Sequence, residues 1–478
     1  MPVTLQRWWP LVLLGLGAFW LRTYDLARRP MHADEANQAV KTGELLEAGR
    51  YAFDPRDHHG PTLYYATLPI AWLRGQTTLA ALDETTVRLV PALAGTLAVL
   101  LLAALAAPLG RWPALAAAAW FATSPPVVYY SRHFGQEMLL VTFTLATLVA
   151  AQRWWLTGRV SWAVAAGVCA GLMQATKESA PLFVLAGAVA LVVVRPPSPA
   201  STRIVRDLLW AGVAALVVAA AFYSSFGTHV AGLRDAVAAY GQAFTRATGE
   251  TGHEKPWWYY PRLLAWQRRG GVVFEQVALS AFALAGAGLA LGSGNKFLRG
   301  AAVYTLVVAV ALSLIPYKTP WHVVHVIPGL ALLAAGALAA PPNWRVAAGL
   351  ALGALALQFA QMNRVAFTYA GDARNPYAYV HSSPDVLKFR ARAVAALSGA
   401  TDRTVRVIGE EYWPLPWYLR GLPGVGYWSA PPADCDGALV IVTASQAEAV
   451  RARLHGTYEE SFLGLRPGVV CVLFTPSP

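Results

Sequence analysis

The run WWPLVLLGLGAFWLR, residues 8–22, is apolar on every side of the helix that it would form, and its one charged residue, Arg22, stands at its end. A helix surrounded by hydrocarbon has this pattern, whereas a soluble helix usually has a polar face. Only Arg7 is basic before the run, and no small-residue cleavage site follows it. We therefore expect a retained membrane anchor rather than a signal peptide.

Similar apolar runs recur along the chain. Hydrophobic residues make up 56% of the sequence and charged residues 13%, whereas a soluble domain has roughly 25% charged residues. This composition predicts an all-α polytopic membrane protein, so the net charge of +12 indicates contact with anionic head groups rather than with nucleic acid. We expect about eleven spans, near residues 8–22, 86–107, 112–130, 135–153, 160–176, 180–195, 207–226, 271–292, 299–316, 320–340 and 344–362.

The basic residues are distributed unequally between the two sides of these spans. With the N-terminus inside, one set of short loops holds Arg111, Arg153, Arg159, Arg195, Arg203, Arg206, Lys296, Arg299 and Arg345. The opposite short loops hold only Arg132, Lys177 and Lys318. Basic loops usually face the cytoplasm. We therefore predict a multi-pass protein of the cytoplasmic (inner) membrane, with the tail outside.

Four features are expected outside the bilayer. The first external loop, 23–85, contains an amphipathic helix over 35–48 that Gly49 ends, and an interfacial or re-entrant apolar helix over 61–75. The external loop 227–270 is polar and aromatic and is expected to lie on the membrane surface.

The tail, 363–478, is predicted to be a small extracytoplasmic α/β domain after a transmembrane domain over 1–362. Its strand candidates are Val405–Ile408, Ala438–Val442 and Val469–Phe474, and a helix is expected over Ser445–Leu454. Cys169 is expected to pack inside a span. Cys435 and Cys471 lie in the tail, where they could pair if the compartment is oxidising.

The ionisable residues of the outer side gather in five stretches that can converge on one cleft. These are MHADE (31–35), DPRDHHGP (54–61), YYSRHFGQE (129–137), TKES (176–179) and YKTPWH (317–322). The stretch MHADEANQ, residues 31–38, allows two interpretations of Asp34. Its carboxylate either caps the helix that follows or acts as a base that takes a proton from a hydroxyl.

The other candidates also have more than one interpretation. His58 and His59 are either solvated loop residues, hydrogen-bond donors to a sugar or phosphate, or ligands of a divalent cation together with His32 and Asp34. Glu137 could simply favour the start of its helix. Lys177 could pair with Glu178 in a turn, and Lys318 could reach the interface from the end of a span. Together, however, the cations that break the charge rule on the outer side (Arg132, Lys177 and Lys318, with His133 beside Arg132) suggest a bound lipid phosphate.

These stretches resemble the GT-C superfamily of integral-membrane glycosyltransferases, in particular the protein O-mannosyltransferases and aminoarabinose transferases. The matching strings are HADEANQA, HHGPTLYY, YYSRHFGQE and ATKES. YKTPWHVVHVIPGLALLAAG (317–336) and EEYWPLPWYLRG (410–421) resemble the prokaryotic flippase-activity-associated proteins of surface-glycoprotein glycosylation. The chain has His59-Gly60-Pro61 where aminoarabinose transferases have Lys-Pro-Pro, and Glu137 where an aspartate is more common.

The resemblance implies a polyprenyl-phosphate sugar donor, an active site on the outer face, and an acceptor hydroxyl on a protein, lipid or glycan. It matches Asp34 to the catalytic acid, Glu35 to its neighbour and Glu137 to a second acid. Arg132, His133, Lys177, Lys318, His58 and His59 are then candidates for the phosphate or the donor sugar. No metal ligand set and no firm cofactor follow, although a divalent cation is compatible with the histidines. Tyr64, Tyr65, Trp257 and Trp258 could stack on sugars or form an interfacial belt.

A flippase or an accessory scaffold for lipid-linked glycans is the alternative function. A transporter of this kind is expected to have broken helices near mid-bilayer or inverted repeats, whereas the charges here lie at the outer edge. The sequence has no Gly-rich loop after a predicted strand, so no nucleotide-sugar site is expected.

Overall fold

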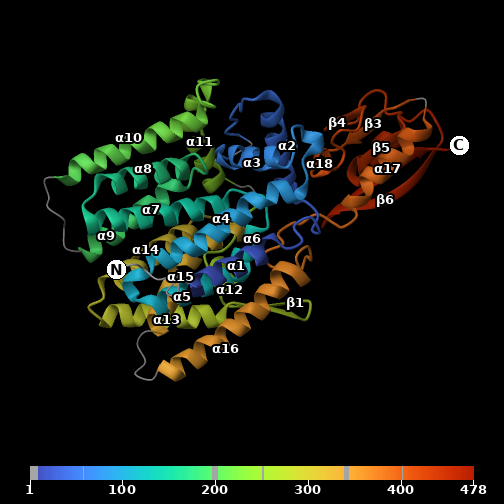
Figure 1. Ribbon diagram of the computed structural model, residues 1–478. Coiled ribbons are helices and arrows are strands. Elements are labelled where there is room, and N and C mark those ends of the chain that lie inside the picture. Colours follow the sequence, from blue (N-terminus) through green and yellow to red (C-terminus); the bar gives the residue numbers. More distant parts are fainter. Residues whose placement is uncertain are drawn as a thin grey trace.

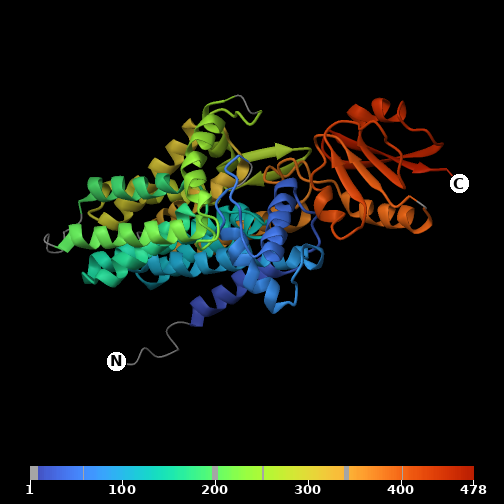
Figure 2. The ribbon, with the colours of Figure 1, turned by 90° about the horizontal axis from the view of Figure 1, so that it is seen from above.

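The computed structural model describes residues 9–56, 59–195, 203–249, 252–338, 344–400 and 402–477. A large helical part and a smaller sheet-containing part lie side by side (Figure 1), and the second view shows the sheet at one end of the helical part (Figure 2). The end of α9 and the start of α10, which flank the Arg-rich loop, lie at the opposite end. The charge-rich stretches of the outer side thus lie toward the sheet-containing part.

Twelve helices of the described residues overlap the eleven predicted spans. They are α1 (Trp9–Thr23), α4 (Glu84–Leu105), α5 (Arg111–Ala122), α6 (Pro125–Ser131), α7 (Glu137–Thr157), α8 (Val160–Gln174), α9 (Ala180–Val194), α10 (Ile204–Tyr223), α13 (Val277–Gly292), α14 (Lys296–Leu314), α15 (Ile327–Leu338) and α16 (Trp344–Asn363). Among the described residues, six helices are long and apolar enough to cross a membrane, and four more are apolar but shorter. A polytopic helical membrane protein is confirmed, whereas the number of spans stays a prediction.

Two predicted spans are wrong in detail. Residues 112–130 do not form one helix, because α5 ends at Ala122 and α6 begins at Pro125. The two prolines after Ser124 lack an N–H and disfavour helical geometry in the residue before them. The span over 271–292 loses its first residues to a hairpin, in which β1 (Trp266–Arg269) and β2 (Val272–Glu275) are joined by Gly270 and Gly271 at positive φ.

Short helices cover the end of the helical part that lies toward the sheet (Figure 1). The predicted amphipathic helix is α2 (Ala33–Ala48), which ends at Gly49 in the left-handed conformation, as predicted. The apolar run over 61–75 forms α3 (Thr62–Leu73), and a 3₁₀ turn, η2 (Leu79–Ala81), follows it. The loop 227–270 contains two helices that the sequence did not predict, α11 (Ala231–Thr248) and α12 (Tyr259–Leu264).

The sheet of the C-terminal part has five strands in the order β4-β3-β5-β7-β6. β3 pairs in parallel with β4 and β5, whereas β7 is antiparallel to β5 and β6. The strands are β3 (Val405–Ile408), β4 (Val425–Trp428), β5 (Leu439–Thr443), β6 (Tyr458–Arg466) and β7 (Val469–Pro476), with helices α17 (Val386–Gly399), α18 (Leu415–Tyr418) and α19 (Ala447–Arg451). The three predicted strands are present, and the helix expected over Ser445–Leu454 is shorter. Cys435 and Cys471 are buried and unbonded.

The first residues of the tail pack on the helical part rather than on the sheet. A π-helical turn, η6 (Arg364–Thr368), continues α16. The hydroxyls of Tyr129 and Tyr130, on α6, donate to the carbonyls of Ala370 and Tyr377, each at 2.9 Å. This linking segment therefore closes over the outer end of α6.

Candidate active site

The start of α2 is organised by His32, not by Asp34. His32 is the N-cap, and its Nδ1 accepts a hydrogen bond from the Asp34 N–H at 3.1 Å. Its Nε2 donates to the carbonyl of Tyr379 at 2.9 Å, so a neutral ring satisfies both contacts. Glu35 completes a capping box by accepting the His32 N–H. The interpretation of Asp34 as the helix cap is therefore wrong.

Glu35 lies at the centre of a buried group that we call the Glu35 cluster: Glu35, Arg29, Arg88 and His133. The Arg88 guanidinium binds both carboxylate oxygens at 2.8 Å, and the N–H groups of Phe134 and His32 donate at 2.8 and 3.0 Å. These four bonds fill the acceptor positions of the carboxylate. Arg29 and His133 approach to 3.6 Å. Both Glu35 and Arg88 are 0% exposed.

The charges of the Glu35 cluster depend on one another. Burial opposes ionisation of Glu35, but Arg88, His133 and Arg29 hold the pKa of its carboxyl well below the usual range. Burial also lowers the pKa of His133 to about 4, although the carboxylate of Glu35 opposes this shift. The cluster is therefore a permanent ion pair between Glu35 and Arg88 beside a neutral imidazole.

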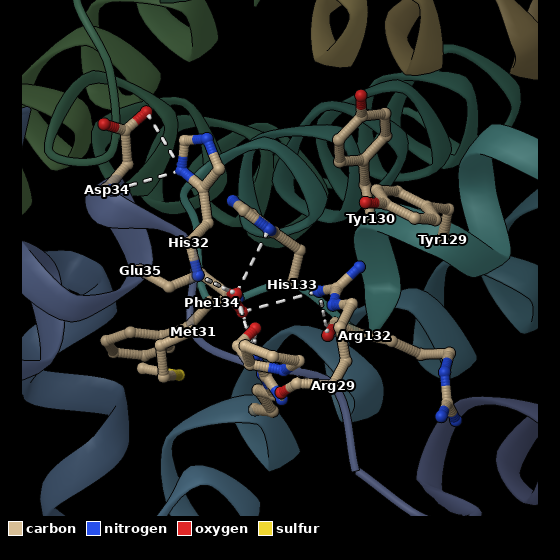
Figure 3. Close-up of polar contacts among 12 residues, drawn as sticks. Arg29, Met31, His32, Asp34, Glu35, Tyr129, Tyr130, Arg132, His133 and Phe134 are labelled. Carbon is tan, nitrogen blue, oxygen red and sulfur yellow. Dashed lines mark hydrogen bonds and ion pairs between the residues drawn. The ribbon is translucent and has the colours of Figure 1, made fainter. Parts of the chain in front are cut away.

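Asp34 points away from this cluster (Figure 3). Its side chain is 58% exposed, and one carboxylate oxygen lies 3.8 Å from Nδ1 of His32. Adjacent carboxylates thus have opposite environments. Glu35 is saturated and inaccessible, whereas Asp34 is held by a fixed backbone and is open to a substrate.

A second buried ion pair, which we call the Glu137 cluster, lies at the start of α7. The Nζ of Lys177 donates to the Glu137 carboxylate at 2.5 Å and lies 3.2 Å from Nε2 of His322. The other ring nitrogen of His322 faces the Tyr260 hydroxyl at 3.3 Å. Three segments that are distant in the sequence therefore meet at one ammonium group.

Next to this cluster, His59 binds Glu178, with 2.9 Å between Nδ1 and the carboxylate. Burial opposes the charge of Glu178, but His59 lowers the pKa of its carboxyl to about 2. Gly60 allows this contact, because a Cβ there would lie 2.2 Å from the Ala175 carbonyl oxygen. The glycine at the position where aminoarabinose transferases have proline thus fits the close approach of two backbones. His58 lies outside the described residues.

Two predicted phosphate ligands bind backbone carbonyls instead. Arg132 donates to the carbonyls of Leu21, Arg22, Tyr24 and Asp25 at the end of α1, and its guanidinium lies over the Phe367 ring. Lys318 is 1% exposed and donates to the carbonyls of Lys255 and Ile315, and burial lowers the pKa of its ammonium group. Neither side chain is directed at Asp34, so we remove both from the candidate phosphate site. His133 belongs to the Glu35 cluster and is likewise not an anion ligand in this arrangement.

The sequence reasoning missed two cations. Arg88 lies at the start of the predicted span 86–107, and an arginine there is itself a signal of a buried partner. Arg246, on α11, was taken as part of a surface loop. One of its guanidinium nitrogens is buried and has no partner in the part of the chain that the structure describes.

Tyr317 lies within electrostatic range of two acids, Asp34 and Glu137. Burial, together with the charges of Asp34 and Glu137, raises the pKa of its hydroxyl to about 12, and Arg246 opposes this shift. Asp34, Arg246 and Glu137 therefore lie within electrostatic range of one side chain. The exposed acid and the Lys177 ammonium, which is bound to Glu137, therefore belong to the same region of the molecule.

The candidate aromatic and metal contacts are only partly available. Tyr64 is fully buried and bonded to Gln38, so it cannot stack on a sugar. Tyr65 is half-buried, whereas Trp257 and Trp258 are exposed. Within the described ranges, the one group of three side chains with metal-binding spacing is Asp434, Asp436 and His455, in the C-terminal part.

The fold defined by these elements is shared with solved structures of other proteins. The structure resembles ArnT from Cupriavidus metallidurans bound to undecaprenyl phosphate, with a TM-score of 0.69 over 97% of both chains and 16% identity. It also resembles the oligosaccharyltransferase of Archaeoglobus fulgidus, with a TM-score of 0.59 over 97% of this chain and 74% of that one, at 14% identity. No curated protein matches the sequence.

Residues 67–224 match the family profile described as dolichyl-phosphate-mannose-protein mannosyltransferase. The family match and the shared fold confirm the predicted resemblance to the GT-C superfamily. Because identity to the solved structures is so low, they establish the fold and not the substrates. The flippase-associated subfamily stays a prediction.

Proposed function

We propose that the chain transfers a sugar from a polyprenyl-phosphate donor to an acceptor hydroxyl on the outer face of the cytoplasmic membrane. The observation that carries this proposal is the pair Asp34 and Glu35. The fully saturated carboxylate of Glu35 fixes the start of α2, and the carboxylate of the preceding residue, Asp34, is exposed on that fixed backbone. A general base needs both accessibility and a defined position.

The proposed reaction inverts the anomeric carbon. The acceptor oxygen attacks C1 of the sugar on the face opposite the phosphate, and its proton passes to Asp34. The bond between C1 and the phosphate oxygen breaks, so that polyprenyl phosphate leaves with its electron pair. Asp34 and the phosphate site must then lie on opposite faces of the sugar.

Lys177 and Arg246 are the proposed phosphate ligands. Lys177 is the cation of the Glu137 cluster, and a phosphate could replace or share its bond to Glu137. Arg246 contributes a buried guanidinium nitrogen that is unpartnered among the described residues. Two cations stabilise the charge that develops on the departing phosphate. A lipid phosphate as the ligand is supported by structures of the same fold, since ArnT is bound to undecaprenyl phosphate and the archaeal oligosaccharyltransferase AglB is in complex with a dolichol-phosphate.

The test is glycosyl transfer by the purified full-length protein from polyprenyl phosphates that carry radiolabelled mannose, glucose or arabinose. Asp34→Asn keeps the size of the side chain and removes the proton acceptor. We expect the rate to fall about 10²–10⁴-fold with unchanged binding of undecaprenyl phosphate. A folded Asp34→Asn variant with full activity would rule out Asp34 as the base.

Glu44→Gln is the matched control, because Glu44 is an exposed acid on the same helix that pairs with Lys41. It removes the same charge from α2 at a distance from its N-terminus, and we expect it to retain full activity. Loss of activity in both variants would indicate a general effect of charge on α2.

The sidedness of the site is tested by labelling single cysteines in a variant without the native ones. The predicted topology places Gly294 inside and Ser398 outside, so impermeant reagents should reach the two positions from opposite sides of the membrane. Reaction of both from one side would refute the proposed location. The acceptor class (protein, lipid or glycan) and a divalent cation at His59 or His32 stay predictions, as does the alternative role as a flippase component.

A further inference from the structure

The motif EEYWPLPWYLRG (410–421) has no part in the proposed reaction, yet it reaches the candidate active site. It contains α18, a short helix of the C-terminal part that packs against α2 and the start of α4 (Figure 1). Leu415 and Trp417 are fully buried there. Through this motif, the C-terminal part contacts α2, the helix that carries Asp34.

The contact is made of hydrogen bonds as well as apolar surface. The hydroxyl of Tyr418 accepts the N–H of Met31 at 2.8 Å, immediately before the cap residue His32. Nε1 of Trp417 donates to Glu84, the first residue of α4, at 2.8 Å. Arg420 lies 3.7 Å over the Trp417 ring and donates to the carbonyl of Leu82. We call these three side chains, Trp417, Tyr418 and Arg420, the α18 latch.

The α18 latch contacts the turn before α2 and the start of α4. Arg88 joins the same two elements from inside the helical part. Arg88 lies one turn after Glu84 on α4, and all five of its N–H groups are used. Two of them bind Glu35 on α2, and three bind the carbonyls of Leu26, Arg29 and Pro30 in the preceding loop. The start of α2 is thus fixed to α4 inside the helical part and to α18 outside it.

The C-terminal part also stiffens the latch. Arg390, on α17, donates to the carbonyls of Tyr418 and Arg420 at 3.2 and 2.7 Å. Gly421 adopts a positive φ of +72°, and a Cβ there would approach the Cβ of Ala80 to 2.9 Å. The latch is therefore part of the packed C-terminal domain rather than a loose strap.

We propose that the α18 latch positions Asp34 for proton transfer, with Tyr418 as the positioning residue, and that the C-terminal domain is in this way a working part of the active site. The inference rests on the proposed function. Asp34 lies three residues after Met31, at the second position of α2, so the place of its backbone depends on the place of the turn that Tyr418 holds. Proton transfer is sensitive to displacements of about 1 Å.

The experiment measures the loop and the rate separately in Tyr418→Phe, which removes only the hydroxyl. Hydrogen–deuterium exchange over residues 26–36 needs no substrate. Because the Met31 N–H then has no partner in a buried position, we expect exchange in this segment to rise about tenfold. In the transfer assay, kcat should fall about tenfold or more, while the affinity for undecaprenyl phosphate stays unchanged.

Tyr412→Phe is the matched control. The Tyr412 ring packs on Tyr427 of β4, at 5.2 Å between centroids. It should change neither exchange over 26–36 nor kcat. Trp417→Phe removes the donor to Glu84 and should also raise exchange over residues 26–36 and lower kcat. It provides a second variant if Tyr418→Phe does not fold.

An unchanged kcat in Tyr418→Phe would overturn the positioning role, whether exchange over residues 26–36 becomes faster or stays the same. A wild-type protein that transfers none of the three sugars would count against the proposed function itself. The exchange measurement would still show whether the latch holds the loop.

Discussion

The Glu35 and Glu137 clusters are both buried carboxylates paired with a cation, yet they differ in what surrounds the pair. Glu35 is bound by a bidentate guanidinium and two backbone N–H groups. Glu137 is bound by an ammonium group that also meets a histidine. The first pair cannot exchange a partner without breaking several fixed bonds, whereas a lysine can turn to another anion. The difference agrees with the proposal that Lys177 can exchange Glu137 for a phosphate, whereas the pair of Glu35 and Arg88 is a fixed structural contact.

The largest expected effect is a loss of stability when Arg88, the partner of Glu35, is removed. Arg88→Ala leaves the Glu35 carboxylate buried without its partner, which typically costs about 3–5 kcal/mol. We expect a large fall in the unfolding temperature of the purified protein, or failure to purify as a monodisperse species. Arg74→Ala is the control, because its pair with Asp83 is partly exposed and should contribute about 0–1 kcal/mol. Equal stability of the two variants would contradict the assigned role.

The second effect is a pH dependence of the Glu35 cluster. The pKa of His133 is lowered from 6.5 to about 4 in the folded protein, mainly by burial. Between these values the unfolded chain binds a proton that the folded protein does not, so stability is full above pH 6.5 and is lost as the pH falls toward 4. The slope is at most about 1.4 kcal/mol per pH unit.

Unfolding temperatures between pH 7 and 5 test this dependence, above the range in which Glu35 itself would take up a proton. His133→Gln should flatten the dependence, while His455→Gln, at an exposed position, should leave it unchanged. An identical pH slope in wild type and His133→Gln would exclude His133 as its source.

The third effect concerns the pair of Lys177 and Glu137. Lys177→Ala should weaken the binding of undecaprenyl phosphate about 10- to 100-fold, because a charge-assisted hydrogen bond of roughly 1.5–3 kcal/mol is lost. The single variant also leaves Glu137 unpaired. The double variant Lys177→Ala/Glu137→Gln removes this complication and should regain stability without regaining affinity. Normal binding by the double variant would show that Lys177 serves only as the partner of Glu137.

The smallest expected effect is that of Arg132→Gln. Since Arg132 binds the carbonyls at the end of α1, the variant should bind undecaprenyl phosphate with an affinity close to that of wild type and lose some stability. Titration of the lipid beside Lys177→Ala gives the direct comparison. A loss of affinity as large as that of Lys177→Ala would return Arg132 to the phosphate site.

The positions of the apolar helices could be predicted because the bilayer imposes composition and length directly on the sequence. The end of α2 at Gly49 and the strands β3, β5 and β7 followed from local rules of the same kind. The hairpin before α13 was missed, although Gly270-Gly271 is itself a local turn signal. The apolar residues of β2 were counted as the start of a span.

The site was predictable only in its composition. The charged stretches of the outer loops were recognised, but which carboxylate is free depends on partners far along the chain. Glu35 meets Arg88 53 positions later, and Lys177 meets Glu137 40 positions earlier. The same holds for Arg132, which looked like an unpaired outer cation and is a ligand of helix-end carbonyls. Spacing in a sequence does not report such pairings.

The hydrogen bond between Met31 and Tyr418 joins residues that are 387 positions apart. During synthesis the loop before α2 leaves the ribosome early, whereas its last partner is made after all the predicted spans. The turn before α2 can therefore gain its hydrogen bond to Tyr418 only when most of the C-terminal part has been translated. If Tyr418 positions Asp34 as proposed, the order of synthesis would keep an unfinished chain from having a completed proton acceptor.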